Sequence, residues 1–264
     1  MSNNDTFYTV DFGVNFANKS RYPDVELEKL MEESYNSGVD RVVCISNSIP
    51  ESKINLELEK KYPNLYFTLG IHPHNAKQFK KSDIAFLETN ISNPKCYGIG
   101  ECGLDYNRMF SPKEKQLEVF GIQIDLASKY NLPVYLHCRD AMDDFIGLLK
   151  EKNYFNGLVH CFTGNLNQAL ELVGLGFKLG ITGWIFDSRR NKDLVNVIKS
   201  KKIPLNMLVV ETDAPFMPIR PAKVSIPSDT GYIVEEIARL RQIDTIECGK
   251  QIYSNSIQML NKFV

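Results

Sequence analysis

The stretch LPVYLHC, residues 132–138, decides the fold, because it is a short and almost continuous apolar run that ends on a histidine. Runs of this kind are typical of strands that are buried on both faces of a parallel sheet. Similar runs recur along the chain. We expect strands over residues 8–14, 41–46, 66–71, 96–101, 133–137, 158–162, 178–182 and 207–211.

Helical patterns separate these runs. We expect helices over residues 24–37, 50–62, 112–130, 141–152, 166–175, 191–199, 232–241 and 245–263, with Ser111 as the N-cap of the helix that begins at Pro112. Eight strands that alternate with helices in units of about thirty residues predict one (β/α)8 TIM-barrel domain over residues 1–264. A doubly wound open sheet is the second possibility.

The composition narrows the classes of function. Of the 264 residues, 43% are hydrophobic and 24% are charged, which is ordinary for a soluble globular protein. A net charge of −1 gives no electrostatic footprint for wrapping duplex nucleic acid, but it does not exclude a nuclease that handles one phosphate at a time through a metal. No apolar run approaches the ~18–20 residues of a membrane span. We therefore expect a cytoplasmic protein without a membrane segment, and a nuclear location stays open.

The cysteines and the N-terminal residues are consistent with a cytoplasmic location. None of the six cysteines forms a C-x-x-C pair, so we expect free thiols that act as small packing groups. Residues 1–5 lack the basic and then apolar order of a signal peptide.

Ionisable side chains stand at the downstream end of several apolar runs. They are His72, His74, Glu101, His137, His160 and Asp213. In a (β/α)8 barrel the active site lies at the carboxyl ends of the strands. The sequence therefore predicts one catalytic centre that contains Glu101, His137, His160 and Asp213.

Two imidazoles and two carboxylates suit a divalent metal, with Mg²⁺ expected first and Mn²⁺ or Zn²⁺ as alternatives. Such an ion polarises a phosphoryl or ester oxygen and activates a bound water for attack near neutral pH. We expect Asp213 to take the proton of that water, and Glu101 also to be catalytic. Taken singly, each residue also has a structural explanation: a hydrogen-bonding histidine, a helix cap at Glu101, or a turn at Asp213.

Further residues near these positions are candidates for supporting roles. His72, His74, Arg139 and Arg108 are predicted to contact the substrate, the arginines by pairing with a phosphate. Both arginines could equally be solvated surface charges. Asp105 is predicted to hold a metal ligand in place.

Six short blocks carry a resemblance to a known family: GIHPH (70–74), GIGECGLDY (98–106), LHCRDA (136–141), HCFTG (160–164), GITG (180–183) and ETDAP (211–215). Together they resemble the TatD-type deoxyribonucleases, over residues 9–263. The resemblance implies a metal-dependent hydrolase on a (β/α)8 barrel, with Glu101, His137, His160 and Asp213 as the metal ligands. It also implies hydrolysis of DNA phosphodiester bonds, as a 3′-to-5′ exonuclease on single-stranded ends. We expect a monomer.

The chain departs from the pattern of many members at two places. Where they carry Asp-x-His-x-His, residues 11–15 are DFGVN, the form found in the branch that includes the bacterial protein that names the family. The resemblance then implies one strong metal site, or one strong and one weak. Asp11 and Asn15 offer oxygen atoms, which keeps Mg²⁺ ahead of Zn²⁺. Where many members have Asn-Glu-Pro, residues 225–227 are Ser-Ile-Pro.

Two other functions remain open from the sequence alone. Related barrels hydrolyse lactones, amides and other esters, and a fold does not fix its substrate. A barrel that has lost its strand-one histidines could also be a non-catalytic binding protein, which predicts little affinity for metal.

Overall fold

The strands follow one another along a single sheet in the order of the chain. The computed structural model describes residues 6–18, 20–22, 24–219 and 221–261, so residues 1–5 and the expected helix end at Phe263 lie outside the described residues. The strands are β1 (Thr9–Val14), β2 (Val39–Cys44), β3 (Leu65–Leu69), β4 (Cys96–Asp105), β5 (Val134–Arg139), β6 (Gly157–Val159), β7 (Lys178–Ile181) and β8 (Leu208–Val210). A helix follows each strand. This order confirms the predicted (β/α)8 barrel and not the doubly wound sheet.

The helices lie close to their expected positions. They are α1 (Asp24–Asn36), α2 (Ile49–Lys61), α3 (Lys81–Asn90), α4 (Lys113–Tyr130), α5 (Met142–Lys152), α6 (Leu166–Leu175), α7 (Lys192–Lys199), α8 (Thr230–Arg241) and α9 (Thr245–Leu260). The sequence did not predict α3, whose one buried residue is Leu87. Among the described residues, no helix has the length and apolarity that a membrane crossing needs.

The expected N-cap at Ser111 is wrong. Pro112 occupies the cap position of α4, and it makes no side-chain cap hydrogen bond. The Ser111 hydroxyl instead donates to the carbonyl of His74 at 2.9 Å and accepts from the N–H of Lys77 at 3.0 Å. The side chain therefore ties two segments together and is not available to the helix.

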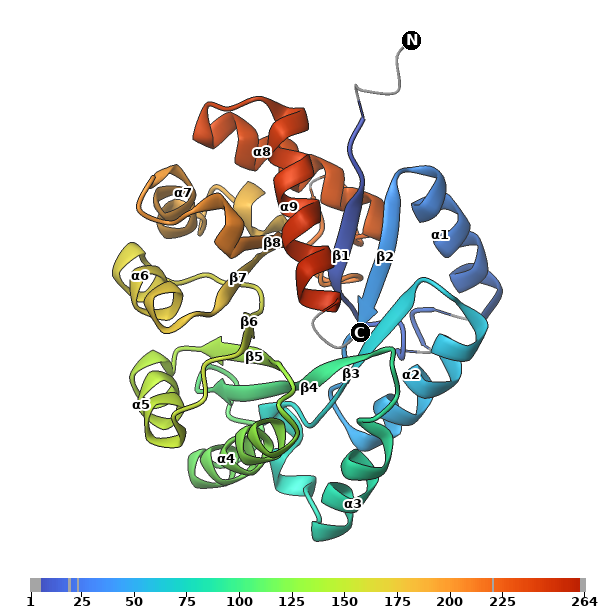
Figure 1. Ribbon diagram of the computed structural model, residues 1–264, viewed down its shortest axis with the longest axis vertical. Coiled ribbons are helices and arrows are strands. Elements are labelled where there is room, and N and C mark those ends of the chain that lie inside the picture. The colour runs from blue at the N-terminus through green and yellow to red at the C-terminus, as the bar shows by residue number, and fades with distance from the viewer. Residues whose placement is uncertain (1–5, 19, 23, 220, 262–264) are drawn as a thin grey trace. The chain divides into compact units, whose positions relative to one another are not determined.

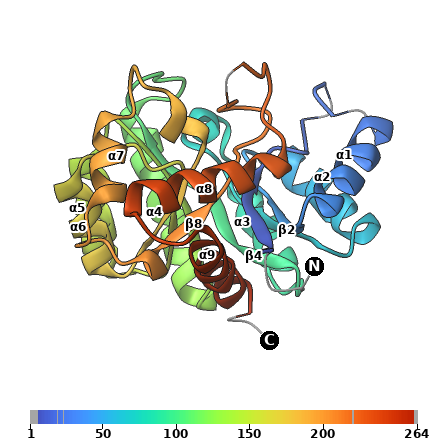
Figure 2. The same ribbon diagram turned by 90° about the horizontal axis from the view of Figure 1, so that it is seen from above.

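The chain divides into two compact units. Residues 1–43, 161–174 and 178–264 form the first unit, in which α9 packs on β1, β8 and α8 (Figures 1 and 2). Residues 44–160 and 175–177 form the second unit, in which β4 lies between β3 and β5, and α4 packs on β4 and α5 (Figure 1). Stacked rings of Phe120 and Phe145, 5.4 Å apart, fill the contact between α4 and α5.

Strand β4 positions most of the candidate site. It is buried over its whole length and continues to Asp105. Glu101 therefore lies within the strand, whereas the sequence predicted that the strand ends at Glu101. Strand β5 runs parallel to it, with Gly103 opposite His137. Gly103 has a φ of +143°, and a Cβ there would lie 1.9 Å from the His137 carbonyl oxygen. Only glycine permits this approach, which sets His137 beside Glu101.

Candidate metal centre

One carboxylate oxygen of the second unit faces three imidazoles. Glu101 Oε1 lies 2.7 Å from His137 Nδ1, 3.4 Å from His72 Nε2 and 3.8 Å from His160 Nε2. Glu101 comes from β4, His137 from β5 and His160 from the residue after β6, while His72 follows β3. The structure thus brings together three of the four predicted metal ligands and places His72, which was predicted to contact the substrate, beside them.

The Glu101 carboxylate carries a negative charge despite its burial. Burial raises its pKa, but the electrostatic interactions with the rings of His72 and His160 and the hydrogen bond from His137 outweigh this effect. The pKa therefore lies well below its ordinary value. A buried carboxylate in this state requires positive charge beside it.

His137 lies between two carboxylates. Its Nδ1 bonds to Glu101, whereas its Nε2 lies 3.4 Å from Asp105 Oδ2. This Nε2 is buried and makes no hydrogen bond within the described residues. Burial lowers the pKa of His137, but the carboxylates of Asp105 and Glu101 outweigh it and raise the pKa. The two carboxylates thus attract positive charge to this ring, either a proton or a cation.

His72 is held as a neutral ring in one tautomer. Its Nδ1 accepts a 3.0 Å hydrogen bond from the backbone N–H of His74, so the ring proton sits on Nε2, toward Glu101. Burial lowers the pKa of His72 to about 4, against the opposing effect of Glu101. In this state His72 is a hydrogen-bond donor to Glu101.

Asp105 holds two of the histidine rings. Its Oδ2 lies 2.7 Å from His74 Nε2, and its Oδ1 accepts the backbone N–H groups of Asn107 and Arg108 at 2.9 Å. Burial raises the pKa of Asp105, but its interactions with the rings of His137 and His74 outweigh this effect and place the pKa well below its ordinary value. These contacts fit the supporting role that the sequence predicts for Asp105.

The predicted phosphate ligands lie at the ends of the same strands. Arg108 is exposed in the loop after β4, and Arg139 is half-buried at the last residue of β5. Their contact with a phosphate stays a prediction.

The sequence did not reveal the partner of His160. The hydroxyl of Tyr135 lies 2.7 Å from His160 Nδ1, and both side chains are buried. This contact orients the ring so that Nε2 faces Glu101. The available signal was spacing, because Tyr135 and His137 stand two residues apart in β5 and so share one face of the strand.

Asp213 lies in the first unit, where two predicted supporting residues hold its segment. Asn15 donates a 2.9 Å hydrogen bond from its side chain to Asp213 Oδ1. Asp11 accepts the backbone N–H of Thr212 at 2.8 Å and its hydroxyl at 2.5 Å. DFGVN therefore fixes the backbone and the side chain around Asp213.

Glu211 is a further buried carboxylate of the first unit that the sequence did not single out. Its Oε1 accepts a 2.5 Å hydrogen bond from the backbone N–H of Cys161. A Cβ at Gly180 would lie 2.3 Å from the same oxygen. Its signal in the sequence is its place in the ETDAP block, two residues before Asp213.

The residues around Glu101 fit a divalent cation. Ligand atoms of His72, Glu101 and His137 all lie within 4.8 Å of one another. The set combines an ionised buried carboxylate with an imidazole nitrogen, His137 Nε2, that is buried without a hydrogen bond within the described residues. Mixed imidazole and carboxylate donors are the ligands that divalent metals bind in hydrolases.

The chain is similar to TatD proteins over nearly its whole length. The family model of TatD-related DNases matches residues 10–261. The 3′-5′ ssDNA/RNA exonuclease TatD of Erwinia tasmaniensis is 34% identical over 260 residues, which cover 95% of this chain and 99% of the relative. The solved structure of YJJV, a TatD homologue of Escherichia coli K12, has a TM-score of 0.86 at 28% identity and covers 96% of this chain and 98% of its own. A TatD-family hydrolase of Entamoeba histolytica has the same TM-score and coverage at 27% identity.

Proposed function

The chain belongs to the TatD-related DNase family, and from this premise we propose that it is a divalent-metal-dependent exonuclease. It removes nucleotides from the 3′ end of single-stranded DNA by hydrolysis of phosphodiester bonds. The observation that carries the proposal is the buried Glu101 carboxylate with three imidazoles around one of its oxygens. The Erwinia relative is named for this reaction on single-stranded DNA and RNA.

The proposed ligands of the metal are Glu101, His137, His160 and Asp213. Mg²⁺ is the expected ion, because carboxylate oxygens supply half of the donors, and one strong site is expected. A divalent ion polarises a phosphoryl oxygen and lowers the pKa of water, which makes hydrolysis possible near neutral pH.

The chain's own residues supply the remaining steps. His72 donates a proton to the hydrogen bond with Glu101 and keeps that carboxylate in place. Asp105 fixes the rings of His74 and His137. In this mechanism Asp213 accepts the proton of the attacking water as general base, with its carboxylate oriented by Asn15.

The substrate contacts of the proposal are electrostatic. His74, Arg108 and Arg139 bind phosphate groups of the strand, the arginines through their planar forks. Because the net charge of the chain is −1, binding depends on such local contacts and not on a global positive field.

A nuclease assay tests the metal, the bond and the direction together. Single-stranded DNA labelled at either the 5′ or the 3′ end is incubated with the protein after treatment with EDTA, and Mg²⁺, Mn²⁺ or Zn²⁺ is then added back. We expect Mg²⁺ to restore digestion, with mononucleotides released first from the 3′ end. An RNA strand tests the second substrate of the relative. Absence of digestion, or digestion unchanged by Glu101→Ala, contradicts the proposal, and size-exclusion chromatography of the same sample tests the expected monomer.

A further inference from the structure

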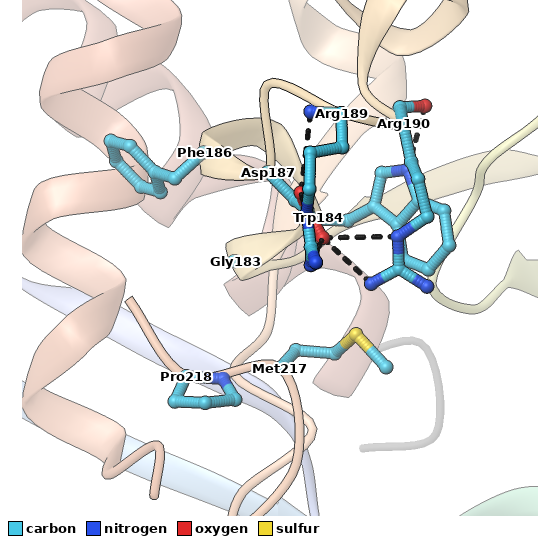
Figure 3. A pocket seen from close by; sticks show the side chains of 8 residues that line it. All are labelled: Gly183, Trp184, Phe186, Asp187, Arg189, Arg190, Met217 and Pro218. Carbon is cyan, nitrogen blue, oxygen red and sulfur yellow. Dashed lines mark hydrogen bonds and ion pairs between the residues drawn. The ribbon is translucent and has the colours of Figure 1, made fainter. Parts of the chain in front are cut away.

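A cavity of about 150 Å³ lies in the first unit, and none of the residues of the candidate metal centre lines it. Figure 3 shows Trp184, Asp187 and two arginines on one side of it, and Met217 with Pro218 on the other. The segment Gly183–Phe186 follows the carboxyl end of β7, the end at which barrel enzymes carry their substrate-binding loops. The proposed metal chemistry leaves this group of side chains unused.

Internal hydrogen bonds fix the loop that carries Trp184. The indole N–H donates to the carbonyl of Arg190 at 3.3 Å, and the backbone N–H of Trp184 donates to the Thr182 hydroxyl at 3.3 Å. The backbone N–H of Arg190 donates to the Asp187 carbonyl at 2.8 Å. The positions of the aromatic ring and the cations are therefore set before any ligand binds.

Asp187 orients two guanidinium groups at once. Its carboxylate accepts Nε and Nη2 of Arg189 at 2.8 Å each, and Nε and Nη2 of Arg190 at 3.0 and 2.7 Å. Each guanidinium has five N–H donors, so both retain donors for an anion. The Arg189 and Arg190 side chains are 61% and 49% exposed. Two positive charges against one negative charge leave the group with a net charge of +1.

Arg190 also lies on the face of Trp184. Its Cζ is 4.0 Å from the centre of the ring, in a cation–π contact. Nucleobases of single strands stack on aromatic rings and on guanidinium planes, and their phosphates bind arginine forks. If the ion pairs of Asp187 served only to stabilise the loop, they would need neither the indole of Trp184 nor a cavity beside it.

We propose that this pocket binds one nucleotide of a single-stranded nucleic acid, with the phosphate on Arg189 and the base against the Arg190–Trp184 pair. The inference rests on the proposed function for its substrate class. It adds a binding site that holds the strand through groups other than the metal ligands. DNA and RNA share the chemistry that this pocket recognises.

The test uses Trp184 as its own reporter, because the chain contains one tryptophan. The protein in EDTA, which prevents hydrolysis, is titrated with a thymidylate octamer and separately with a uridylate octamer, and tryptophan fluorescence is followed. We expect saturable quenching by both octamers. Arg189→Ala and Arg190→Ala should each raise the Kd about tenfold. Arg189→Ala should also reduce the slope of log K against log salt by about 0.7, the value for one phosphate contact on a single strand.

The matched control is Arg239→Ala. Arg239 is 68% exposed and makes a two-pronged pair with Glu236, so the variant removes the same charge and a similar ion pair outside the pocket. Its Kd should equal that of the wild type. Arg189→Gln serves as a second variant if Arg189→Ala loses the far-ultraviolet circular dichroism of the folded chain.

Any one of three results would overturn the proposal that this pocket binds a nucleotide. They are no quenching, equal Kd values for the Arg189 variants and Arg239→Ala, or tripolyphosphate binding as tightly as the octamers. The last result would mean a plain anion site without base recognition. The titration involves no hydrolysis, so its outcome is separate from that of the nuclease assay. If the protein is inactive but still shows specific quenching, only the proposed exonuclease activity is contradicted. If it is active but shows no quenching, only the proposed nucleotide-binding pocket is contradicted.

Discussion

Glu101 Oε1 and His137 Nδ1 are joined by a 2.7 Å hydrogen bond between adjacent strands β4 and β5. The Glu101 side chain is 5% exposed and the His137 side chain 19%, and the bond couples the charge of the carboxylate to the proton of the ring. Removing one partner of such a buried pair leaves the other without compensation, which costs more than the pair itself contributes.

Glu101→Gln should abolish both metal binding and catalysis. The amide keeps the shape of the side chain but removes the negative charge that three imidazoles face. We expect activity on single-stranded DNA to fall at least about a hundredfold. Calorimetric titration with Mg²⁺ should show no binding at the centre. Glu118→Gln, an exposed change on α4, is the control and should behave as wild type. Retained Mg²⁺ affinity in Glu101→Gln would remove Glu101 from the ligand set.

Tyr135→Phe should lower activity without unfolding the protein. The variant deletes the hydroxyl that orients His160 and leaves the aromatic ring in the core. Partners of metal ligands typically contribute 10–100-fold to activity or metal affinity, so we expect a loss of about tenfold in kcat/KM. Tyr154→Phe removes a hydroxyl that bonds to the carbonyl of Leu132, and it should leave kcat/KM unchanged. Equal kinetics for the two variants would show that the Tyr135 contact does not serve catalysis.

Gly103→Ala should destabilise the second unit. The new Cβ would meet the His137 carbonyl at 1.9 Å, and alanine is strained at a φ of +143°. Backbone strain of this kind costs roughly 1–3 kcal/mol, and the steric clash adds to it. Urea unfolding measures the loss. Gly147→Ala in α5 is the matched control, since nothing lies within 4 Å of its Cβ. It should stabilise the chain by about 0.5–1 kcal/mol, because alanine favours a helix.

The order of strands and helices could be predicted from the sequence because buried parallel strands and amphipathic helices leave strong periodic signals. The same signals placed Glu101 and His137 near each other, since adjacent parallel strands carry their side chains side by side. The boundary of β4 could not be predicted. A charged residue looks like the end of a strand, yet β4 continues to Asp105 because β5 pairs with it as far as that residue, across a shift in register between Gly100 and Cys102.

Contacts between distant segments escaped prediction for a related reason. Ser111 looked like a helix cap, but its hydroxyl found partners in His74 and Lys77 that no local pattern reveals. Helix α3 was missed because it buries one residue, Leu87, and so shows little apolar periodicity. In the sequence Tyr135 cannot be told apart from other aromatic residues of the core, because its hydroxyl contacts His160, which lies 25 residues further along the chain.

The stability of the first unit should depend on the charge of Asp11. Burial outweighs the hydrogen bonds from Thr212 and Gly13 and raises the pKa of this carboxyl well above its ordinary value. The folded chain therefore binds the proton more tightly than the unfolded chain. The stabilisation is complete below the unfolded pKa of about 3.9 and is lost as the pH rises through the folded pKa.

Asp11→Asn removes this titration. The free energy of unfolding of the wild type, minus that of the variant, should fall as the pH is raised from about 4, as measured by urea unfolding at a series of pH values. A difference that stays constant or increases with pH contradicts the raised pKa.

The hydrogen bond from the His74 N–H to His72 Nδ1 links a backbone turn to the state of an imidazole. If a ligand, a proton or a substitution moved the ring proton to Nδ1, the acceptor would vanish and the amide of His74 would lose its partner. The nuclear magnetic resonance signal of the His74 amide proton therefore reports the tautomer of the His72 ring. It reports the chemical state of a ring beside Glu101 without any label on the ring itself.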